Sequence, residues 1–217
     1  MKQIRVMLAD DHEVVRGGLR TVIEAMPGWV VCGEASDGRS AVRMAEELKP
    51  DIVVMDMGMP ELNGLDATRR IRKACPETEV LIFTGDTAEH LVQQVFEAGA
   101  RSYVLKTEGQ EHLDAALRAL ARHKPYFTTK VGEMLFVRFL EGKSGATTEE
   151  GEGRLTSRER EVVQLVAEGR SNREMSAALG ISVKTGETHR AAVMKKLKLK
   201  AFSELVRYAV RNRIISA

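Results

Sequence analysis

Carboxylates at two points of the 217-residue chain have the type and the clustering that phosphoryl chemistry needs. Asp10 and Asp11 are adjacent, and Asp56 lies farther along the chain. If folding brings the three together, their charges repel one another unless a cation joins them, and oxygen ligands at this density suit Mg²⁺. We therefore predict a divalent metal site that includes these three carboxylates.

Two further side chains complete this chemistry. The Thr84 hydroxyl and the Lys106 ammonium are groups that hold an anion beside a metal ion. A carboxylate, a hard cation, an ammonium and a hydroxyl together can form and stabilise an acyl phosphate, with Asp56 as the nucleophile. A single carboxylate of this set is more often a helix cap, but all five positions together favour a reactive pocket.

The elements that position these residues follow from the apolar pattern of the first 122 residues. Short apolar, β-branched runs predict strands at residues 4–8, 29–33, 52–55, 80–83 and 103–105, with helical spacing between them. Five alternations of strand and helix predict a doubly wound, parallel five-stranded sheet. Ligands collect at the carboxyl ends of such strands, and each residue of the predicted pocket follows or ends one of them.

Charge divides the chain more sharply than its net value of +2 indicates. Residues 1–125 hold 16 Lys and Arg against 20 Asp and Glu, whereas residues 154–217 hold 14 against 6. A basic module that follows an acidic one predicts a nucleic-acid partner for the C-terminal part. With no membrane-length apolar run and no signal-peptide pattern, we expect a cytoplasmic protein without a membrane partner, in which Cys32 and Cys75 are reduced, buried thiols.

Three segments follow from these patterns: a first domain at residues 1–124, a linker with a short helix at 125–153, and an all-α domain at 154–217. The linker contains the glycine-rich stretch 141–153 and a predicted helix at 131–140. In the last segment, Thr156 and Ser171 each begin a capping box, and Ser182 and Ser203 are candidate caps for two further helices. Four short helices in about 60 residues is the size of a helix-turn-helix module.

Residues 1–122 resemble the receiver domain of response regulators. The matching segments are LADDH at 8–12, VMDMGMP at 54–60, NGL at 63–65, FTG at 83–85 and YVLK at 103–106. The resemblance implies a flavodoxin-like fold with Asp56 as the phosphoacceptor. It also implies that Asp11 binds Mg²⁺ directly, that Asp10 does so through water, and that the backbone carbonyl of Gly58 is a further ligand.

The same resemblance assigns roles to three residues on the last strands. Thr84 and Lys106 are expected to hold the phosphoryl oxygens, and Tyr103 to turn inward when Thr84 moves. For Tyr103, a half-buried strand tyrosine without a switch role is the alternative. His12 follows the acidic pair, but we expect it to cap a helix and not to bind the metal.

Residues 155–217 resemble the LuxR/NarL-type helix-turn-helix, so the whole chain resembles a NarL/FixJ-type transcription factor. The matching segments are LTSRERE at 155–161, AEGRSNRE at 167–174 and LGIS at 179–182. The predicted recognition helix is 183–197. Its predicted outward, DNA-facing row is Lys184, Thr185, Glu187, Thr188, Arg190, Ala191 and Lys195. The cations in this row would mostly contact phosphates, and Glu187, Thr188 and Ala191 would face base edges.

One residue of the recognition helix departs from the family pattern, because Gly186 stands where a branched apolar residue is usual. Glycine within a helix costs about 1 kcal/mol relative to alanine. We therefore expect Gly186→Val to stabilise the helical domain by about 1–2 kcal/mol by filling vacant space. Alternatively, a neighbour such as Met175 or Met194 already fills that space, and valine overpacks it.

Together these patterns predict a two-component transcription regulator that is not an enzyme. A histidine kinase would phosphorylate Asp56, and the activated homodimer would bind double-stranded DNA. A regulator whose receiver is not controlled by phosphorylation would lack one of the acid, Thr or Lys positions. A metal-dependent aspartyl phosphatase would have a second acid two residues after the nucleophile, where this chain has Gly58. Asp86, two residues after Thr84, is expected to orient the water that hydrolyses the phosphoryl group.

Overall fold

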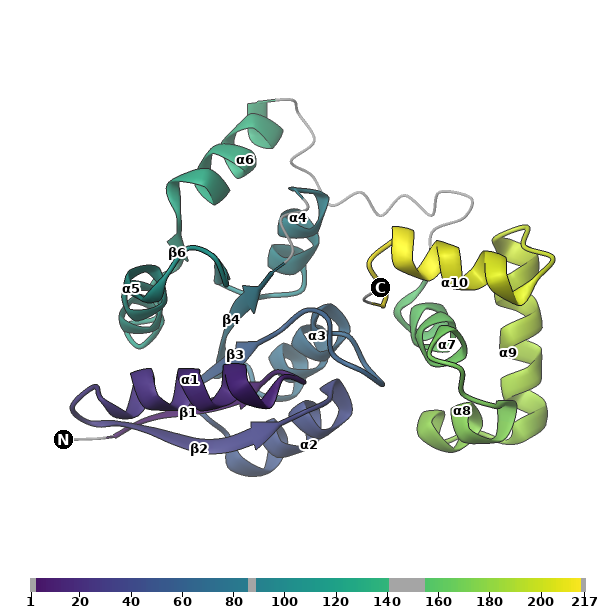
Figure 1. Ribbon diagram of the computed structural model, residues 1–217, viewed down its shortest axis with the longest axis horizontal. Helices are drawn as coiled ribbons and strands as arrows, with labels where there is room; N and C mark the ends of the chain where they lie inside the picture. The colour runs from purple at the N-terminus through teal and green to yellow at the C-terminus, as the bar shows by residue number, and fades with distance from the viewer. Residues whose placement is uncertain (1–2, 86–88, 141–154, 216–217) are drawn as a thin grey trace. The chain divides into compact units, whose positions relative to one another are not determined.

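The computed structural model describes residues 3–85, 89–140 and 155–215. They form two compact units, an α/β unit that runs from β1 to α6 and a helical unit that runs from α7 to α10 (Figure 1). The glycine-rich stretch 141–153, predicted to be a flexible linker, lies outside the described residues.

A parallel sheet with strand order β2-β1-β3-β4-β5-β6 forms the centre of the α/β unit. Its strands are β1 (Ile4–Ala9), β2 (Trp29–Ala35), β3 (Ile52–Met55), β4 (Glu79–Thr84), β5 (Ser102–Leu105) and β6 (Tyr126–Phe127). The predicted doubly wound, flavodoxin-like fold is confirmed. The predicted strand count is one too low, because β6 adds a sixth strand.

The additional strand, β6, pairs with β5 through Ser102 and Tyr126 and through Tyr103 and Phe127. These residues lie in the predicted linker, because a two-residue strand has no alternation of apolar and polar residues from which it could be predicted. The Phe127 ring packs edge-on against Phe96, which lies in the helix between β4 and β5, with the ring centroids 4.9 Å apart. Pairing and ring contact together tie residues 126–127 to the sheet.

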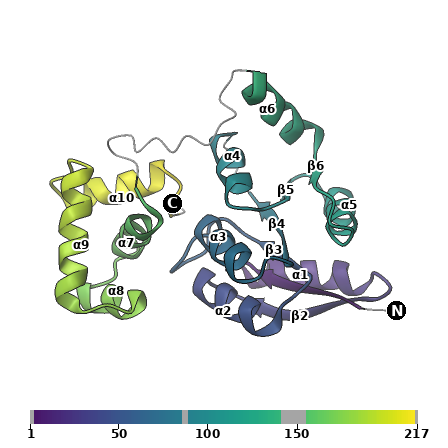
Figure 2. The ribbon, with the colours of Figure 1, turned by 180° about the vertical axis from the view of Figure 1, so that it is seen from behind.

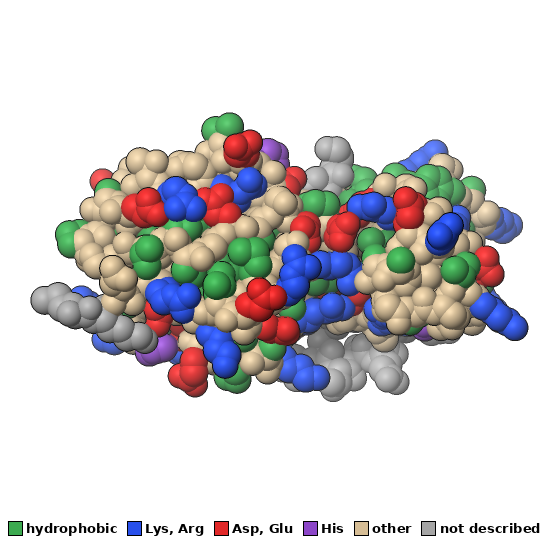
Figure 3. All heavy atoms as spheres, turned by 90° about the horizontal axis from the view of Figure 1, so that it is seen from below, with side chains coloured by type: hydrophobic (Ala, Val, Ile, Leu, Met, Phe, Trp, Pro, Cys, Tyr) green, Lys and Arg blue, Asp and Glu red, His purple; other side chains and the backbone are tan. Residues whose placement is uncertain are grey.

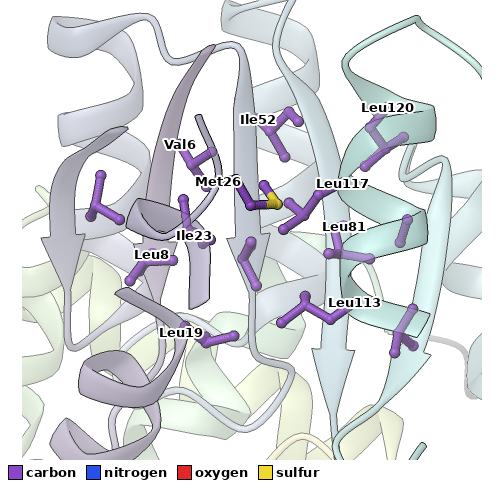
Figure 4. Packing of buried hydrophobic residues seen from close by; sticks show 14 residues of the cluster. Val6, Leu8, Leu19, Ile23, Met26, Ile52, Leu81, Leu113, Leu117 and Leu120 are labelled. Atoms are coloured by element: carbon purple, nitrogen blue, oxygen red, sulfur yellow. The ribbon is translucent and has the colours of Figure 1, made fainter. Parts of the chain in front are cut away.

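Helices cover both faces of this sheet. The helices of the α/β unit are α1 (Glu13–Glu24), α2 (Gly38–Leu48), α3 (Gly64–Ala74), α4 (Glu89–Glu97), α5 (Gln110–Leu120) and α6 (Thr129–Leu140), of which α6 packs against α4 and β6. α1 lies nearer the viewer in Figure 1, and α2 and α3 lie nearer in the opposite view of Figure 2. α1 and α5 pack on one face, where Leu19, Ile23 and Leu117 meet the strand residues Val6 and Leu8 (Figure 4).

Side chains of successive strand residues point to opposite faces of the sheet. In β5, Val104 belongs to the core beneath α1 and α5, so its neighbour Tyr103 points to the other face. Each fully buried aliphatic side chain of such a core contributes about 1.5–3 kcal/mol. The core therefore fixes the strand ends, where the polar residues of the sequence motifs lie.

The helical unit contains α7 (Ser157–Ala167), α8 (Asn172–Leu179), α9 (Val183–Lys196) and α10 (Phe202–Arg211). Both predicted capping boxes are confirmed, at Thr156 with Glu159 and at Ser171 with Glu174. Ser182 caps α9 as predicted, since its hydroxyl accepts a hydrogen bond from the backbone N–H of Thr185 at 3.1 Å. These caps satisfy N–H groups that a helix leaves unpaired at its start.

The predicted cap at Ser203 is wrong, because α10 begins at Phe202 and its N-cap is Ala201, two residues before Ser203. The Glu204 carboxylate accepts hydrogen bonds from the backbone N–H groups of Lys200 and Ala201, at 2.6 and 3.1 Å. The Glu204 carboxylate therefore satisfies the backbone N–H groups of the two residues that precede the helix, and its charge also suits a helix N-terminus.

Two further expectations concern membrane character and the thiols. Among the described residues, none of the helices combines the length and the apolar character that crossing a membrane requires. Both cysteines are free; Cys75 is buried, as expected, but Cys32 is only half-buried.

Candidate functional site

The carboxyl ends of β1, β3 and β5 bring Asp10, Asp56 and Lys106 together. The Lys106 ammonium lies 2.7 Å from Asp10 Oδ2 and 2.8 Å from Asp56 Oδ1. Only 2% of Asp10 and 7% of Asp56 is exposed. Carboxylates this close and this buried need compensating positive charge, which Lys106 supplies in part.

Backbone N–H groups complete the hydrogen bonding of the two carboxylates. Gly58 donates to Asp56 Oδ2 at 2.6 Å, and His12 donates to Asp10 Oδ1 at 2.9 Å. Each carboxylate thus has one oxygen on Lys106 and the other on a backbone N–H. Their orientations are fixed before any ligand arrives.

Burial dominates the electrostatics of Asp56 and raises the pKa of its carboxyl. Lys106 opposes this effect and the charge of Asp10 adds to it. Burial alone would lower the pKa of Lys106, but its hydrogen bonds to Asp10 and Asp56 outweigh burial, and the pKa is raised. Lys106 is therefore cationic at neutral pH, and the pocket favours a further positive charge beside Asp56.

Asp11 is exposed at the edge of this pocket. Ligand atoms of Asp10, Asp11 and His12 lie within 4.8 Å of one another, the spacing of a group that can hold a metal ion. His12 occupies the N-cap position of α1, as predicted, but its side chain makes no cap hydrogen bond. Its Nδ1 lies 2.8 Å from Asp11 Oδ1 instead.

Thr84 and Tyr103 lie on neighbouring strands beside the pocket. Thr84 ends β4 with 3% of its surface exposed, and its backbone carbonyl accepts a hydrogen bond from the Lys106 N–H at 2.8 Å. Tyr103 is 1% exposed, so its side chain is inside and not half-buried. Asp86, predicted to orient water, lies outside the described residues.

Gly64 has a role in this site that the sequence analysis did not assign. A Cβ at Gly64 would collide with the backbone carbonyl oxygen of Asp56 and approach Met57 Cα to 3.0 Å. The start of α3 can pass over the Asp56 main chain only because this residue has no side chain. The glycine of the NGL motif is visible in the sequence. The reason for a glycine at this position is the close approach to the Asp56 main chain, which is seen only in the folded structure.

The second candidate site is the surface of α9. Six residues of the predicted outward row are exposed and one, Arg190, is half-buried; the exposed ones are Lys184, Thr185, Glu187, Thr188, Ala191 and Lys195. Gly186 and Val193 on the inward side are buried, and His189 and Leu197 are half-buried. The helix therefore presents the predicted face, and Lys and Arg side chains protrude from the surface of this unit (Figure 3).

Some polar groups of α9 already have partners within the unit. The Thr185 hydroxyl lies 2.8 Å from Ser182 Oγ at the helix cap, and the Thr188 hydroxyl donates to the carbonyl of Lys184 at 3.0 Å. The Arg190 guanidinium donates to Asn172 Oδ1 of α8 at 3.0 Å. Arg190 thereby links the two helices of the helix-turn-helix.

The expected vacant space beside Gly186 is already filled. A Cβ there would collide with Ser176 Oγ of α8 and lie 3.1 Å from Met175 Cε and 3.4 Å from Ser176 Cβ. The predicted stabilisation by valine therefore rests on a wrong premise. The alternative, in which Met175 or Met194 fills this space and valine overpacks it, is correct in part. Met175 contacts the site, but Ser176 occupies most of the space.

Comparisons with known proteins cover both units. Residues 6–118 match the family model of the response regulator receiver domain, and residues 153–209 match that of bacterial regulatory proteins of the luxR family. The transcriptional regulatory protein LiaR of Bacillus subtilis is 38% identical over 213 residues, which are 98% of this chain and 100% of LiaR. The oxygen regulatory protein NreC of Staphylococcus carnosus is 34% identical over 98% of this chain and 99% of its own.

Solved structures show the same relationship. RcsB of Salmonella enterica serovar Typhimurium, bound to the rprA promoter in the presence of the phosphomimetic BeF₃⁻, matches with a TM-score of 0.61 and 25% identity. That match covers 95% of this chain and 98% of the RcsB chain. A LuxR-family two-component response regulator from Aurantimonas matches with a TM-score of 0.61 and 36% identity, over 64% of this chain and 99% of its own.

Proposed function

The chain belongs to the response regulators that carry a receiver domain and a LuxR-family DNA-binding domain, and from this premise we propose that Asp56 accepts the phosphoryl group that controls it. The observation that carries the proposal is the position of Lys106, which bridges Asp10 and Asp56 at 2.7 and 2.8 Å. Two buried carboxylates hold the Lys106 ammonium at this position. From there it can bind the negatively charged oxygens of a phosphoryl group on Asp56.

The reaction is a transfer between two side chains. An Asp56 carboxylate oxygen attacks the phosphorus of a phosphohistidine on a partner histidine kinase. The new oxygen–phosphorus bond forms as the phosphorus–nitrogen bond breaks, and the imidazole leaves with its electron pair. Lys106 balances the charge of the phosphoryl oxygens, and the Thr84 hydroxyl donates a hydrogen bond to one of them.

The donor set of the pocket fits Mg²⁺. Asp11 and Asp56 would supply carboxylate oxygens, Asp10 would bind through water, and Gly58 would supply a backbone carbonyl. Hard oxygen ligands of this kind are those that Mg²⁺ prefers. The raised pKa of Asp56 supports the same assignment, because the buried carboxylate lacks full compensation by Lys106. When bound, Mg²⁺ would neutralise charge on the transferred group.

The output is transcriptional control through α9 as the recognition helix. Lys184, Arg190 and Lys195 would contact phosphates and hold the helix in the major groove of double-stranded DNA. Glu187, Thr188 and Ala191 would face base edges.

Coupling between the two sites requires an element with two states. Thr84 and Tyr103 lie on adjacent strands, and a movement of Thr84 toward a phosphoryl group would shift the buried Tyr103 side chain and change the surface formed by α4 beside β4 and β5. We propose that this change promotes a homodimer in the cytoplasm that binds two DNA half-sites.

Labelling with a small phosphodonor tests the assignment of Asp56. Wild-type protein incubated with acetyl phosphate and Mg²⁺ should gain one phosphoryl group, and a chelator should prevent the gain. Asp56→Asn should not be labelled, whereas Asp51→Asn, a change of another aspartate in the same unit, should be labelled normally. Equal labelling of wild type and Asp56→Asn would contradict the proposal.

A further inference from the structure

Arg16 of α1 binds the main chain of the acidic pocket. Its NH1 group donates to the backbone carbonyl of Asp10 at 2.7 Å, and its Nε donates to Glu34 Oε2 of β2 at 3.1 Å. Only 15% of the Arg16 side chain is exposed. The guanidinium therefore joins the end of β1 to the neighbouring strand and to the helix that follows the pocket.

Glu34 is itself fixed by a second arginine. Arg20, one turn after Arg16, donates from Nε to Glu34 Oε1 at 2.8 Å. Burial alone would raise the pKa of Glu34, but the hydrogen bonds from Arg20 and Arg16 lower it. Glu34 is thus a charged anchor at neutral pH, and both of its oxygens are engaged.

The Asp10 main chain is consequently held on both sides. Its N–H donates to the carbonyl of Ala35 at 3.1 Å, which continues the pairing of β1 with β2. Its carbonyl, which lies beyond the end of β1, accepts from Arg16. This carbonyl belongs to the peptide that joins Asp10 to Asp11, so its orientation sets the direction in which the Asp11 side chain leaves the chain.

We propose that Arg16 is a positioning residue that fixes the Asp10–Asp11 peptide and so sets the affinity of the pocket for a divalent cation. The inference rests on the proposed function, because it requires that this pocket binds Mg²⁺. Mg²⁺ demands near-ideal octahedral geometry, so carboxylates that shift by about half an ångström bind it less tightly. Removal of the positive charge of Arg16 would by itself strengthen cation binding, so weaker binding in an Arg16 variant reports a geometric effect.

Arg20 provides a matched control, because it shares Glu34 with Arg16, whereas its other contact among the described residues is with Glu24 and not with Asp10. Mg²⁺ binding to the full chain should be measured by isothermal titration calorimetry without any phosphodonor. We expect Arg16→Met to raise the dissociation constant about 10-fold, the lower end of the effect of supporting residues at metal sites. Arg20→Met should stay within about twofold of wild type, and Arg16→Lys should recover part of the loss.

A second readout separates positioning from general destabilisation. Phosphorylation by acetyl phosphate should need more Mg²⁺ in Arg16→Met, yet approach the wild-type rate once Mg²⁺ saturates. Equal dissociation constants for wild type and Arg16→Met, or equal losses in Arg16→Met and Arg20→Met, would overturn the role of Arg16. Failure of wild type to bind Mg²⁺ at all would overturn the proposed metal site as well, which distinguishes the two failures.

Discussion

The contact between α8 and α9 makes the effect of Gly186→Val a sensitive test of the packing described above. Valine would place a Cβ against Ser176 Oγ and 3.1 Å from Met175 Cε, and its two methyl groups would extend beyond the Cβ. Ser176 is 1% exposed, and among the described residues its Oγ has no hydrogen-bond partner. The substitution therefore inserts three carbons into a region that is already full.

Two effects of opposite sign determine how much Gly186→Val changes the free energy of unfolding. Overpacking of a core costs about 1–3 kcal/mol, whereas replacing a helical glycine recovers less than about 1 kcal/mol of helix propensity. We expect a net loss of about 1–2 kcal/mol in the free energy of unfolding of the helical unit. For a unit of this size, that corresponds to a melting midpoint lower by roughly 4–16 °C.

Thermal unfolding of the full chain, followed by calorimetry so that both units are seen, measures this loss. Ser176→Ala removes the obstructing and unpaired hydroxyl, so the double variant should recover much of the stability. The coupling between the two sites should be at least about 0.5 kcal/mol, since the side chains would be in contact. A midpoint for Gly186→Val at or above wild type, or no coupling with Ser176→Ala, would refute the packing argument.

Three further outcomes follow from the two sites. Asp56→Asn should raise the melting midpoint of the metal-free protein at pH 7.5. Folding raises the pKa of the Asp56 carboxyl, so the folded state loses stability relative to the unfolded state as the pH rises through that pKa. The gain from Asp56→Asn should therefore shrink toward about pH 4, and an equal gain at both pH values would contradict this argument. Asp86→Ala should lengthen the half-life of the phosphorylated protein severalfold, measured by acid-quenched decay, and an unchanged rate would refute the role of Asp86. DNA affinity should fall steeply with salt in a filter or fluorescence titration, because residues 154–217 carry 14 Lys and Arg against 6 Asp and Glu; a flat dependence would exclude phosphate contacts as the main source of affinity.

The sequence predicts most of the α/β fold because its core strands are continuous apolar runs. The predicted strand at 52–55 has the same bounds as β3. Each of the other four predicted strands is one or two residues shorter than the observed strand at one or both ends. β6 was missed because pairing with β5, not the pattern of residues 126–127, defines it. The predicted start of α10 is wrong because Glu204 binds the backbone N–H groups of Lys200 and Ala201, so that Ala201 occupies the N-cap position without a serine or threonine side chain.

Tertiary contacts explain what could not be predicted about the sites. Nothing in the spacing of Arg16 and Glu34 indicates that they meet at the Asp10 carbonyl, because α1 and the β1–β2 pairing create that contact. The fit of Gly186 against Ser176 likewise depends on how closely α8 approaches α9. Chemistry-bearing residues at strand ends were predictable, since the fold class alone places them at one edge of the sheet.

The central claim is that phosphorylation of Asp56 controls DNA binding, and one titration tests it most directly. A duplex with two half-sites about 10 bp apart, selected by the phosphorylated protein from a random pool, is titrated with full-length protein with and without Mg²⁺ and the acyl-phosphate analogue beryllium trifluoride. Wild type should bind at least about tenfold more tightly with the analogue, and Asp56→Ala should not respond. Equal affinity of wild type in both conditions, or an equal response of Asp56→Ala, would contradict the account.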